Sequence, residues 1–404
     1  MTRTCGLIGA SALDWRTVAI HGDDPNPVRE EFPLAAGRTY LNNASVHPMS
    51  LSTRRAVQAY LEARTTGSPE TGTPDPRVPV ARVKSLFASL IGAREVDIAL
   101  VPSTTVGENL VVSGLGIPGI QGNIVTDALH FEGSLYHYQS LQRKGLDVRM
   151  VVPRGGRIDL NDMERVIDRQ TKLVAVSLVS WINGFTHDVK ALCEIAHAHG
   201  ALVYADVIQA AGARPIDVVA LDVDFCASAS YKWLMGDFGA GFLYVKDKHL
   251  GSALARTQYG FRQLEEFATH FLPGDPPGDG PISWTQRGGA AGHFEVGTWA
   301  SAAITALGNS LEFLQRVGVD RISAHNRALA MRIQRELPRL GFAPLTPDES
   351  VGSIVSFAVK DREDTARRLT RAKVDVSLGA HRMRISPSIY SNDQDVDALI
   401  AALA

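Results

Sequence analysis

Residues 226–245 read CASASYKWLMGDFGAGFLYV, and the fold is best worked out from this stretch. Small and apolar residues up to Ser230 have the composition of a buried strand, and a glycine-rich turn leads into a second apolar run that ends at Val245. Lys232 lies between the two runs, although lysine is normally exposed. In the simplest alternative, its aliphatic stem packs at the strand end and its ammonium group reaches water. The rest of the sequence must decide between a boundary lysine and a functional one.

Short apolar runs alternate with amphipathic runs over residues 80–245. The apolar runs show little polar alternation, which is typical of parallel strands that are buried on both faces. Helical patterns separate them, such as residues 80–93 with one apolar stripe and residues 188–200 with a terminal glycine. This alternation predicts an α/β fold with helices on both faces of a parallel sheet, whose ligands bind beyond the carboxyl ends of the strands. The predicted strands are DIALVPS (97–103), GNIVTDAL (122–129), DVRMVVP (147–153), KLVAVSLVS (172–180), ALVYAD (201–206) and VDFCASAS (223–230).

The pattern changes after this region. Residues 272–293, LPGDPPGDGPISWTQRGGAAGH, are rich in glycine and proline and predict a long loop. A long helix is expected over residues 301–318, and apolar runs from about residue 352 onward predict a small α/β unit. The chain has 404 residues, more than one core usually supports, so two domains are expected.

The composition is that of a soluble globular protein, with 45% hydrophobic residues, 21% charged residues and a net charge of −2. This charge argues against a nucleic-acid or membrane-surface partner, and no apolar run approaches the roughly 18 residues of a membrane span. Residues 1–18 lack the apolar core of a signal peptide, so a cytoplasmic protein is expected. The three cysteines, Cys5, Cys193 and Cys226, are far apart, which indicates a reducing compartment with no disulfide framework and no metal-ligand spacing.

Polar side chains stand at the ends of two further strands. Ser103, Thr104 and Thr105 follow a strand and precede a helical run, where hydroxyl and free N–H groups bind anions, although such residues are also ordinary helix caps. Asp206 ends the run ALVYAD, and a carboxylate there is costly to bury unless it meets a cation or a strong donor. Its simpler alternative role is to cap the next helix.

The anion site, the carboxylate and Lys232 would converge on one crevice, because the carboxyl ends of parallel strands meet at one edge of a sheet. Pyridoxal 5′-phosphate (PLP) needs all three groups: an anion site for its phosphate, a carboxylate that keeps its pyridinium nitrogen protonated, and a lysine amine for its aldehyde. Burial near a cationic partner lowers the pKa of a lysine and frees its amine for attack and proton transfer. The sequence therefore predicts a PLP enzyme with Lys232 and Asp206 as catalytic residues.

From YLNNASVHP (residues 40–48) to RMRISPSIYSNDQDVDAL (residues 382–399), the sequence resembles the class V aminotransferase family of fold type I PLP enzymes. This family includes cysteine desulfurases, isopenicillin N epimerase-like proteins and, more distantly, kynureninase. Its Asp-x-x-Gln motif is matched by Asp206 and Gln209, and its lysine motif is matched at Lys232. The resemblance implies that Asp206 pairs with the pyridinium nitrogen, that Gln209 approaches the ring hydroxyl, and that Lys232 forms the Schiff base and shuttles protons.

The resemblance also implies the domain organisation and the assembly. A large PLP-binding domain over residues 40–300 is expected to hold a mixed, mostly parallel sheet flanked by helices. Residues 1–39 and 301–404 are expected to form a small domain with a C-terminal α/β part. FEVGTW (residues 294–299) resembles an element in which Thr298 reaches the phosphate of the neighbouring subunit, which implies a homodimer with shared active sites.

Further cofactor contacts follow from the same resemblance. Thr104 and Thr105 match the phosphate-binding turn. Phe131, in HFEGSLYHY, falls where the family stacks an aromatic ring on the cofactor, although Phe131 could be a core residue and His130 could face the ring instead.

Two positions depart from the family pattern. Most members have histidine directly before the lysine, whereas this chain has Tyr231, as kynureninase-like members do. The Tyr231 hydroxyl could bind phosphate, and Ser228 and Ser230 are candidates for the same role. Trp181 stands where the family often has an asparagine near the cofactor hydroxyl, with Asn183 two residues later, so Trp181 is expected either to shape the substrate pocket or simply to pack.

The substrate side of the site is predicted from three features. Arg384, in RMRIS, matches the arginine that binds the substrate α-carboxylate, a task that suits its planar fork. Without that motif a surface ion pair would explain Arg384. His47 is expected to line the entrance. The loop at 272–293, with Phe271 and Trp284 near it, hints at a substrate larger than a free amino acid, although a plain surface loop is the simpler explanation.

The positions of the cysteines argue against one type of reaction. Cysteine desulfurases use a cysteine in a loop before the carboxylate-binding arginine, and this chain has no cysteine between about residues 310 and 384. A persulfide mechanism is therefore not expected. We expect a β-eliminating C–S lyase that acts on an amino acid or a cysteine conjugate through a carbanion. An aminotransferase, an epimerase of an amino-acid-containing metabolite and a decarboxylating PLP enzyme remain alternatives. The intact set of Lys232, Asp206 and Arg384 argues against a non-catalytic binding protein.

Overall fold

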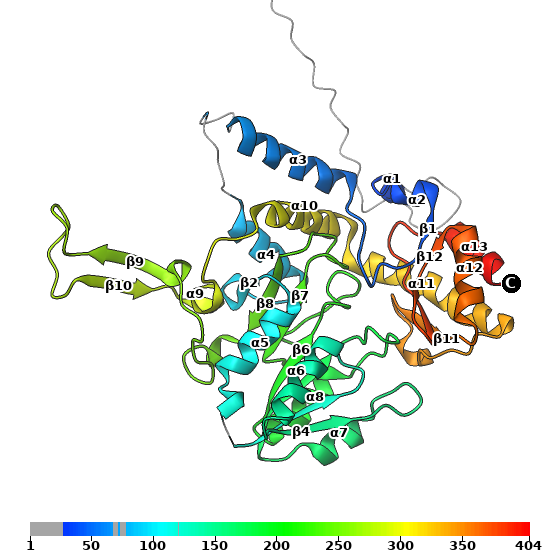
Figure 1. Cartoon of the computed structure of the whole chain (residues 1–404), viewed down its shortest axis with the longest axis horizontal. Helices are drawn as coiled ribbons and strands as arrows, with labels where there is room; N and C mark the ends of the chain where they lie inside the picture. Colours follow the sequence, from blue (N-terminus) through cyan, green and yellow to red (C-terminus); the bar gives the residue numbers. More distant parts are fainter. Residues whose placement is uncertain (1–26, 68–71, 73–77, 120) are drawn as a thin grey trace, which may run out of the picture.

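A seven-stranded sheet is the centre of the computed structural model, which describes residues 27–67, 72, 78–119 and 121–404 (Figure 1). The strand order is β2-β8-β7-β6-β5-β3-β4. Neighbours from β4 to β7 are parallel, whereas β8 is antiparallel to both β7 and β2. The predicted mixed, mostly parallel sheet is thereby confirmed. The strands are β2 (Ile98–Val101), β3 (Asn123–Asp127), β4 (Asp147–Val151), β5 (Thr171–Ser177), β6 (Leu202–Asp206), β7 (Phe225–Ala229) and β8 (Gly241–Val245).

Both faces of this sheet are covered, which explains why its strands lack polar alternation. Successive residues of a strand point to opposite faces, and on β6 Val203 belongs to one hydrophobic core while Tyr204 belongs to another. The first core also contains Leu86, Leu192 and Leu307 from three covering helices. The covering helices are α4 (Val80–Leu90), α7 (Leu160–Val166), α8 (Val189–Ala198) and α10 (Ser301–Val317) on that face, with α5 (Thr104–Gly114) and α6 (Glu132–Gln142) on the other.

A smaller α/β unit follows at the C-terminal end of the chain and appears in orange and red in Figure 1. Its antiparallel sheet has the order β11-β14-β13, and β1 pairs in parallel with β12, which brings the segment before the large sheet against this unit. A third hydrophobic core holds it together. Its elements are β1 (Thr39–Tyr40), β11 (Val355–Ala358), β12 (Val374–Asp375), β13 (Ser377–Leu378), β14 (Arg382–Ile385), α11 (Val319–Glu336), α12 (Arg362–Ala372) and α13 (Asp393–Leu403).

The remaining helices are short or peripheral. They are α1 (Pro27–Glu30), α2 (Leu34–Gly37), α3 (Leu51–Thr66), α9 (Gly289–Phe294) and the 3₁₀ segments Glu95–Asp97, Ile117–Gly119, Asp247–His249, Phe261–Gln263, Leu337–Leu340 and Asp348–Ser350. The predicted domain division at residues 40–300 stays a prediction, and residues 1–26 of the expected small domain lie outside the described residues.

The expected long loop at residues 272–293 is only partly a loop. Ile282–Gln286 forms strand β10, which pairs antiparallel with β9 (Leu264–Thr269), and α9 follows from Gly289 (Figure 1). The run ISWTQ is rich in β-branched and aromatic residues, which favour strands, so the flanking glycines and prolines mark the tip and base of a hairpin. The hairpin extends from the body of the molecule and exposes Phe267 and Trp284, which are cross-strand partners.

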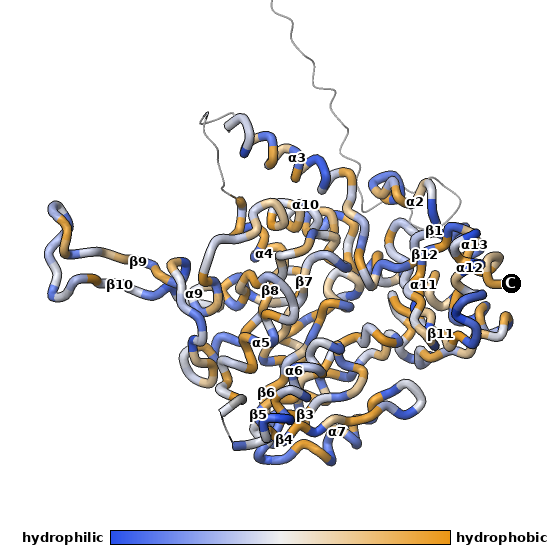
Figure 2. Tube along the Cα trace, in the orientation of Figure 1, coloured by the Kyte–Doolittle hydropathy of each residue, from blue (hydrophilic) through white to orange (hydrophobic). Residues whose placement is uncertain are grey.

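Hydropathy follows these layers. In Figure 2 the strands of the large sheet are mostly hydrophobic, whereas hydrophilic residues gather around α12 at the outer side of the C-terminal unit. No helix in the described part of the chain is long and apolar enough to cross a lipid bilayer.

Gly212 holds the loop after β6 against the loop after β7. Its φ is +87°, and a Cβ at this position would collide with the carbonyl oxygen of Trp233, next to Lys232. Gly200 also has a positive φ, +79°, but a Cβ there would meet open space.

We therefore expect Gly212→Ala to lower the free energy of unfolding by about 2–5 kcal/mol, since backbone strain and overpacking add. The matched control Gly200→Ala is expected to cost only about 1–2 kcal/mol, because it brings strain alone. Urea unfolding of both variants measures the difference. Equal losses would show that the contact between the two loops is not tightly packed.

Candidate active site

Asp206 is the last residue of β6 and is 3% exposed. One of its carboxylate oxygens accepts a hydrogen bond from the backbone N–H of Ile208 at 2.9 Å. Burial raises the pKa of Asp206 to about 6, while the charges of His130 and Lys232 and the hydrogen bond from Ile208 act in the opposite direction. The carboxylate is therefore held at the carboxyl end of the sheet by groups that favour its ionised form.

Lys232 follows β7, the neighbour of β6, and is 8% exposed. Burial lowers the pKa of its ammonium group to about 8; the charge of Asp206 raises this pKa and that of Arg384 lowers it. Its Nζ lies 5.7 Å from the centroid of the Tyr231 ring. Within the described chain, Nζ makes no hydrogen bond or ion pair, so its amine is available to a ligand.

Glycines let the chain turn tightly around this lysine. A Cβ at Gly236 would lie 2.8 Å from Cβ of Ser230, and a Cβ at Gly241 would lie 2.6 Å from the carbonyl oxygen of Ser228. The Ser228 hydroxyl donates to the backbone oxygen of Ala229, and the Ser230 hydroxyl donates to that of Asp237. Tyr231 is half-buried and its ring stacks on Phe238 at 4.5 Å between centroids. Whether Ser228, Ser230 or Tyr231 contacts a phosphate stays a prediction.

The start of α5 lies beside the end of β7. Thr104 Oγ1 accepts a hydrogen bond from the backbone N–H of Ala229 at 2.9 Å, and Ser103 caps the helix by accepting from Val106 N–H at 3.2 Å. Thr104 is buried and Thr105 is exposed. First-turn N–H groups of a helix have no intrahelical partner and favour anions. The expected anion site and Lys232 are thus brought to the same end of neighbouring elements.

Arg384 reaches the site from β14 of the smaller unit and is 4% exposed. Its Nη1 donates to the backbone oxygen of Trp181 at 2.9 Å, and its Nη2 donates to Ser45 Oγ at 2.5 Å. Its Nε is buried and has no hydrogen-bond partner. Burial and, to a smaller extent, the charge of Arg382 lower the pKa of Arg384 to about 10. A buried guanidinium that meets only neutral oxygens is suited to receive a carboxylate.

Aromatic side chains surround this guanidinium. The Trp181 ring centroid lies 5.9 Å from the Arg384 guanidinium carbon and 6.4 Å from the Phe131 ring centroid, at an interplanar angle of 71°. Phe131 is half-buried. The amide of Asn183 instead donates to the backbone oxygens of Gly156 and Leu345, which gives it a structural role between loops.

His130 belongs to a buried network that the sequence did not indicate. Its Nδ1 pairs with Ser177 Oγ at 2.8 Å and its Nε2 with Glu108 Oε1 at 3.2 Å. Burial alone would lower the pKa of His130, but the charge of Glu108 and the hydrogen bond to it raise it overall. Glu108 also accepts from the hydroxyls of Ser134 and Tyr138, both at 2.5 Å. The only sequence signal was a glutamate on the core-facing side of a helical run. Which of Phe131 and His130 covers the cofactor stays a prediction.

The side chains of two other predicted site residues form hydrogen bonds within the protein. Gln209 donates to the backbone oxygen of Ala44 at 3.0 Å and accepts from Trp233 Nε1 at 2.8 Å. His47 pairs with Ser388 Oγ and the backbone oxygen of Pro48, each at 2.8 Å. Both residues therefore link segments around the site, and their contacts with cofactor or substrate stay predictions.

Thr298 lies on the loop that precedes α10. It is exposed and borders a cavity of about 350 Å³ that is also lined by Val106 of α5 and Gly239 of the turn before β8. Thr298 thus has no contact with the predicted phosphate site of its own chain among the described interactions.

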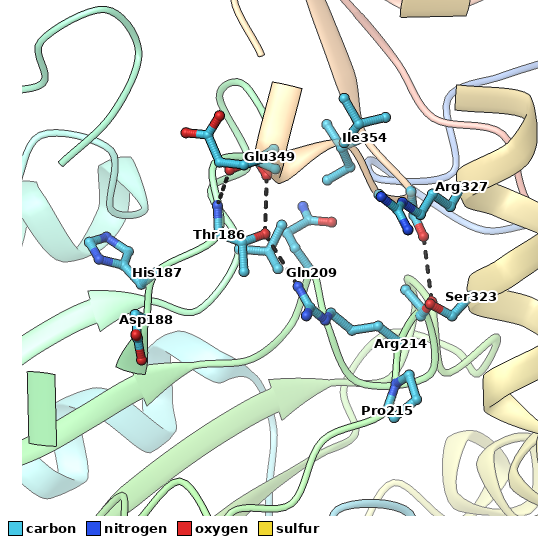
Figure 3. A pocket seen from close by; sticks show the side chains of 17 residues that line it. Thr186, His187, Asp188, Gln209, Arg214, Pro215, Ser323, Arg327, Glu349 and Ile354 are labelled. Atoms are coloured by element: carbon cyan, nitrogen blue, oxygen red, sulfur yellow. Dashed lines mark hydrogen bonds between the residues drawn. The ribbon is translucent and has the colours of Figure 1, made fainter. Parts of the chain in front are cut away.

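A further cavity, of about 520 Å³, borders Gln209 and is shown in Figure 3. Its lining joins Arg214 of the β6–β7 connection to Arg327 of α11, and in Figure 3 Arg214 points toward Thr186, to which it donates at 3.3 Å. The lining includes Gln209 but neither Lys232 nor Arg384, so this cavity borders the strand-end site without containing its amine or its guanidinium.

Residues 77–399, which contain Lys232, Asp206 and Arg384, match the model of the protein family described as "Aminotransferase class-V". The chain belongs to the aminotransferase class-V family. This confirms the predicted family, and with it the prediction of a PLP-dependent enzyme.

Curated aminotransferase class-V proteins similar to this chain carry two kinds of name. A probable cysteine desulfurase of Methanothermobacter thermautotrophicus is 27% identical over 88% of this chain and 87% of its own length. An uncharacterized aminotransferase of Bacillus subtilis is 26% identical over 94% and 97%. Among solved structures, the apo cysteine desulfurase of Thermococcus onnurineus has a TM-score of 0.81 at 24% identity, covering 93% of this chain and 96% of that one. That likeness supports the fold.

The residues at the strand ends fit PLP by their chemistry. The site offers an amine and a carboxylate from adjacent strands, helix N–H groups for a phosphate, and glycines at which added side chains would crowd the lysine turn. When bound, PLP supplies an electron sink for the bonds of the substrate Cα.

The electrostatic balance at Lys232 can be tested in the cofactor-free protein. The pKa of Lys232 is expected near 8, and Asp206→Asn should lower it because an attraction that favours the charged amine is lost. Arg384→Gln should raise it because a repulsion is lost. The pH dependence of competitive acetylation at Lys232, followed by mass spectrometry, measures the three values. Arg214→Gln removes an arginine outside the site and should leave the profile unchanged, whereas a rise with Asp206→Asn would contradict the assignment.

Proposed function

We propose that this protein is a PLP-dependent C–S lyase that acts on a cysteine conjugate. The observation that supports it is the buried amine of Lys232, with a pKa near 8, in the combined field of the Asp206 carboxylate and the Arg384 guanidinium, whose Nε has no hydrogen-bond partner among the described residues. Elimination converts the conjugate and one water into a thiol, pyruvate and ammonia. The Cα proton leaves to a base, the Cβ–S bond breaks, and the sulfur leaves with its electron pair and gains a proton.

Each of the site residues has a task in this proposal. Lys232 holds the cofactor and, once displaced by the substrate amine, removes the proton from Cα, which suits an amine whose pKa lies near neutrality. Asp206 pairs with the pyridinium nitrogen. Arg384 binds the α-carboxylate through its forked donors and fixes the substrate above the ring. Trp181 forms one wall of the substrate pocket, and the role of His47 is to hold the segment beside Tyr231, whose backbone oxygen accepts from His47 N–H at 3.0 Å.

The remaining cofactor contacts are proposed from position. The N–H groups of Thr104 and Thr105, with the neighbouring Ser230 and Tyr231, bind the phosphate. Gln209 lies at the ring hydroxyl, and Phe131 or His130 covers the ring. We further propose a homodimer in which Thr298 of one chain completes the phosphate site of the other. The exposure of Thr298 supports this assignment.

The cysteines of the chain bear on whether the substrate sulfur is transferred to a protein thiol. Several relatives are named cysteine desulfurase, but no cysteine follows Cys226 in the sequence. Cys193 and Cys226 are buried, and burial raises the pKa of the Cys193 thiol to about 12 and raises that of Cys226 as well. Neither thiol is suited to attack as a thiolate. The sulfur therefore leaves with the substrate fragment and is not transferred to the protein. These free thiols also support our proposal of a cytoplasmic location.

Transamination is the second candidate, because the Bacillus subtilis relative, which matches almost the full length of both chains, is named an aminotransferase. It would use the same lysine as both base and acid. The two reactions differ in product: the lyase releases pyruvate and ammonia repeatedly, whereas a half-transamination converts the cofactor to its amine form in one turnover.

The reaction itself is tested with the purified holoenzyme. We expect borohydride to fix PLP covalently on Lys232, and S-substituted cysteines to give pyruvate, ammonia and thiol in equal amounts. Lys232→Ala should retain the fold by circular dichroism and lose at least about 10³-fold in kcat, because it removes both the anchor and the base. A stoichiometric amine form without pyruvate would replace the lyase by an aminotransferase, and a protein that takes up no PLP would contradict the proposal altogether.

The absence of a sulfur-accepting cysteine gives a separate prediction. A cysteine-free variant, Cys5→Ser, Cys193→Ala and Cys226→Ala, is expected to keep kcat within about twofold of the wild type, since the two described thiols only fill core volume. Alkylation with iodoacetamide should likewise leave pyruvate formation unchanged. A loss of turnover in the variant, with normal PLP content and unfolding transition, would show that a protein thiol takes part.

A further inference from the structure

A second arginine stands beside Arg384. Arg382 lies two positions earlier on β14, so both side chains leave the same face of the strand. The guanidinium carbon of Arg382 lies 5.4 Å from the centroid of the Trp181 ring, and that of Arg384 lies 5.9 Å from the same centroid. Both cations therefore lie within 6 Å of the centroid of one indole ring.

Neither guanidinium group forms an ion pair with a carboxylate of a described residue. Arg384 donates only to a backbone oxygen and a hydroxyl. Arg382 is partly exposed and makes no hydrogen bond or ion pair with any described residue. Burial lowers the pKa of Arg382, and the only charge that counteracts this is that of the exposed Glu132. Two adjacent cations that lack a fixed counter-ion are arranged to meet an anionic ligand.

A cavity adjoins Arg382, and its lining does not include Arg384. It has a volume of about 720 Å³, and Arg382, His381, Arg157 and Asp348 provide its charged or titratable lining. Arg157 is already paired with Glu349, with donors at 2.5 and 3.0 Å. Arg382 is consequently the arginine of this lining that has no hydrogen-bond or ion-pair partner in the part of the chain that the structure describes.

We propose that the natural substrate carries a second carboxylate at the end of its side chain, and that Arg382 binds it while Arg384 binds the α-carboxylate. This inference rests on the proposed function and narrows its substrate class to acidic cysteine conjugates. Two residues of a strand span roughly 6.6 Å. The two carboxyl carbons of S-carboxymethylcysteine are separated by five bonds, or about 6 Å when extended. A planar carboxylate also matches the fork of an arginine better than a spherical anion does.

The test compares two probes of equal shape on the holoenzyme: S-carboxymethyl-L-cysteine and its neutral amide, S-carbamoylmethyl-L-cysteine. Dissociation constants come from calorimetry and from the change in cofactor absorbance, and kcat and KM come from pyruvate release. The wild type should bind the acid about 10- to 100-fold more tightly than the amide, the range for a hydrogen-bonded charged group. Arg382→Gln should remove this preference by weakening the acid alone, with kcat unchanged for the amide.

Two further variants keep the outcome clear. Arg214→Gln removes an arginine from the separate cavity in Figure 3 and should retain the full preference. Arg382→Lys keeps the charge but loses the fork, and should retain part of it. A wild type that binds both probes equally, or an Arg382→Gln variant that weakens both equally, would overturn the inference.

The design separates this inference from the proposed function. If both probes bind with the predicted preference but no pyruvate appears, the lyase reaction is wrong and the acidic subsite stands. If pyruvate forms from both probes without preference, the lyase stands and the subsite is wrong. If borohydride fixes no PLP on Lys232, both are overturned.

Discussion

The site depends on the balance between burial and attraction at Lys232 and Asp206. Burial raises the pKa of Asp206 to about 6 and lowers that of Lys232 to about 8, so each group alone would move toward its neutral form. Their mutual attraction opposes both shifts. At neutral pH the carboxylate stays largely ionised and the ammonium group lies close enough to its pKa to lose a proton at small cost. This balance requires β6 and β7 to be neighbours, with Asp206 opposite Ala227 in the register.

The segment from Asn42 to His47 contacts residues beside both Lys232 and Arg384. Asn43 donates to the backbone oxygen of Ser386 at 2.8 Å, close to Arg384 on β14, and Ser45 accepts directly from Arg384. Ala44 accepts from Gln209 after β6, and His47 N–H donates to Tyr231 beside Lys232. One short stretch thus links the large sheet, the lysine turn and the arginine strand. The positions of Lys232 and Arg384 are thus linked through one segment, by one backbone hydrogen bond and three contacts that involve side chains.

Local patterns allowed much of this to be predicted, and long-range contacts explain the rest. The buried strands, Lys232 and Asp206 could be recognised because apolar runs and strand-end polar residues are adjacent in sequence. The Glu108–His130 network could not, since it joins α5, β5 and the segment before α6 through side chains far apart in the chain. The β9–β10 hairpin was mistaken for part of a loop because glycine and proline dominate its tip. The hydrogen bonds of the Gln209 amide to Trp233 and Ala44 could not be predicted either, because no local sequence pattern connects these residues.

The pair Arg382 and Arg384 carries a folding cost that the chain does not relieve internally. Arg384 is buried against neutral oxygens with its Nε unpaired, and the neighbouring charge of Arg382 lowers its pKa further. Replacing such groups by apolar side chains would often be neutral or stabilising, so stability does not account for two adjacent arginines. A ligand with two carboxylates would neutralise the charges of both arginines. The free energy of their burial, which destabilises the unliganded fold, would then contribute to ligand affinity and to substrate discrimination. In the proposed function, the lysine–carboxylate pair would make the chemistry at Cα available, whereas the arginine pair would select which amino acids reach it.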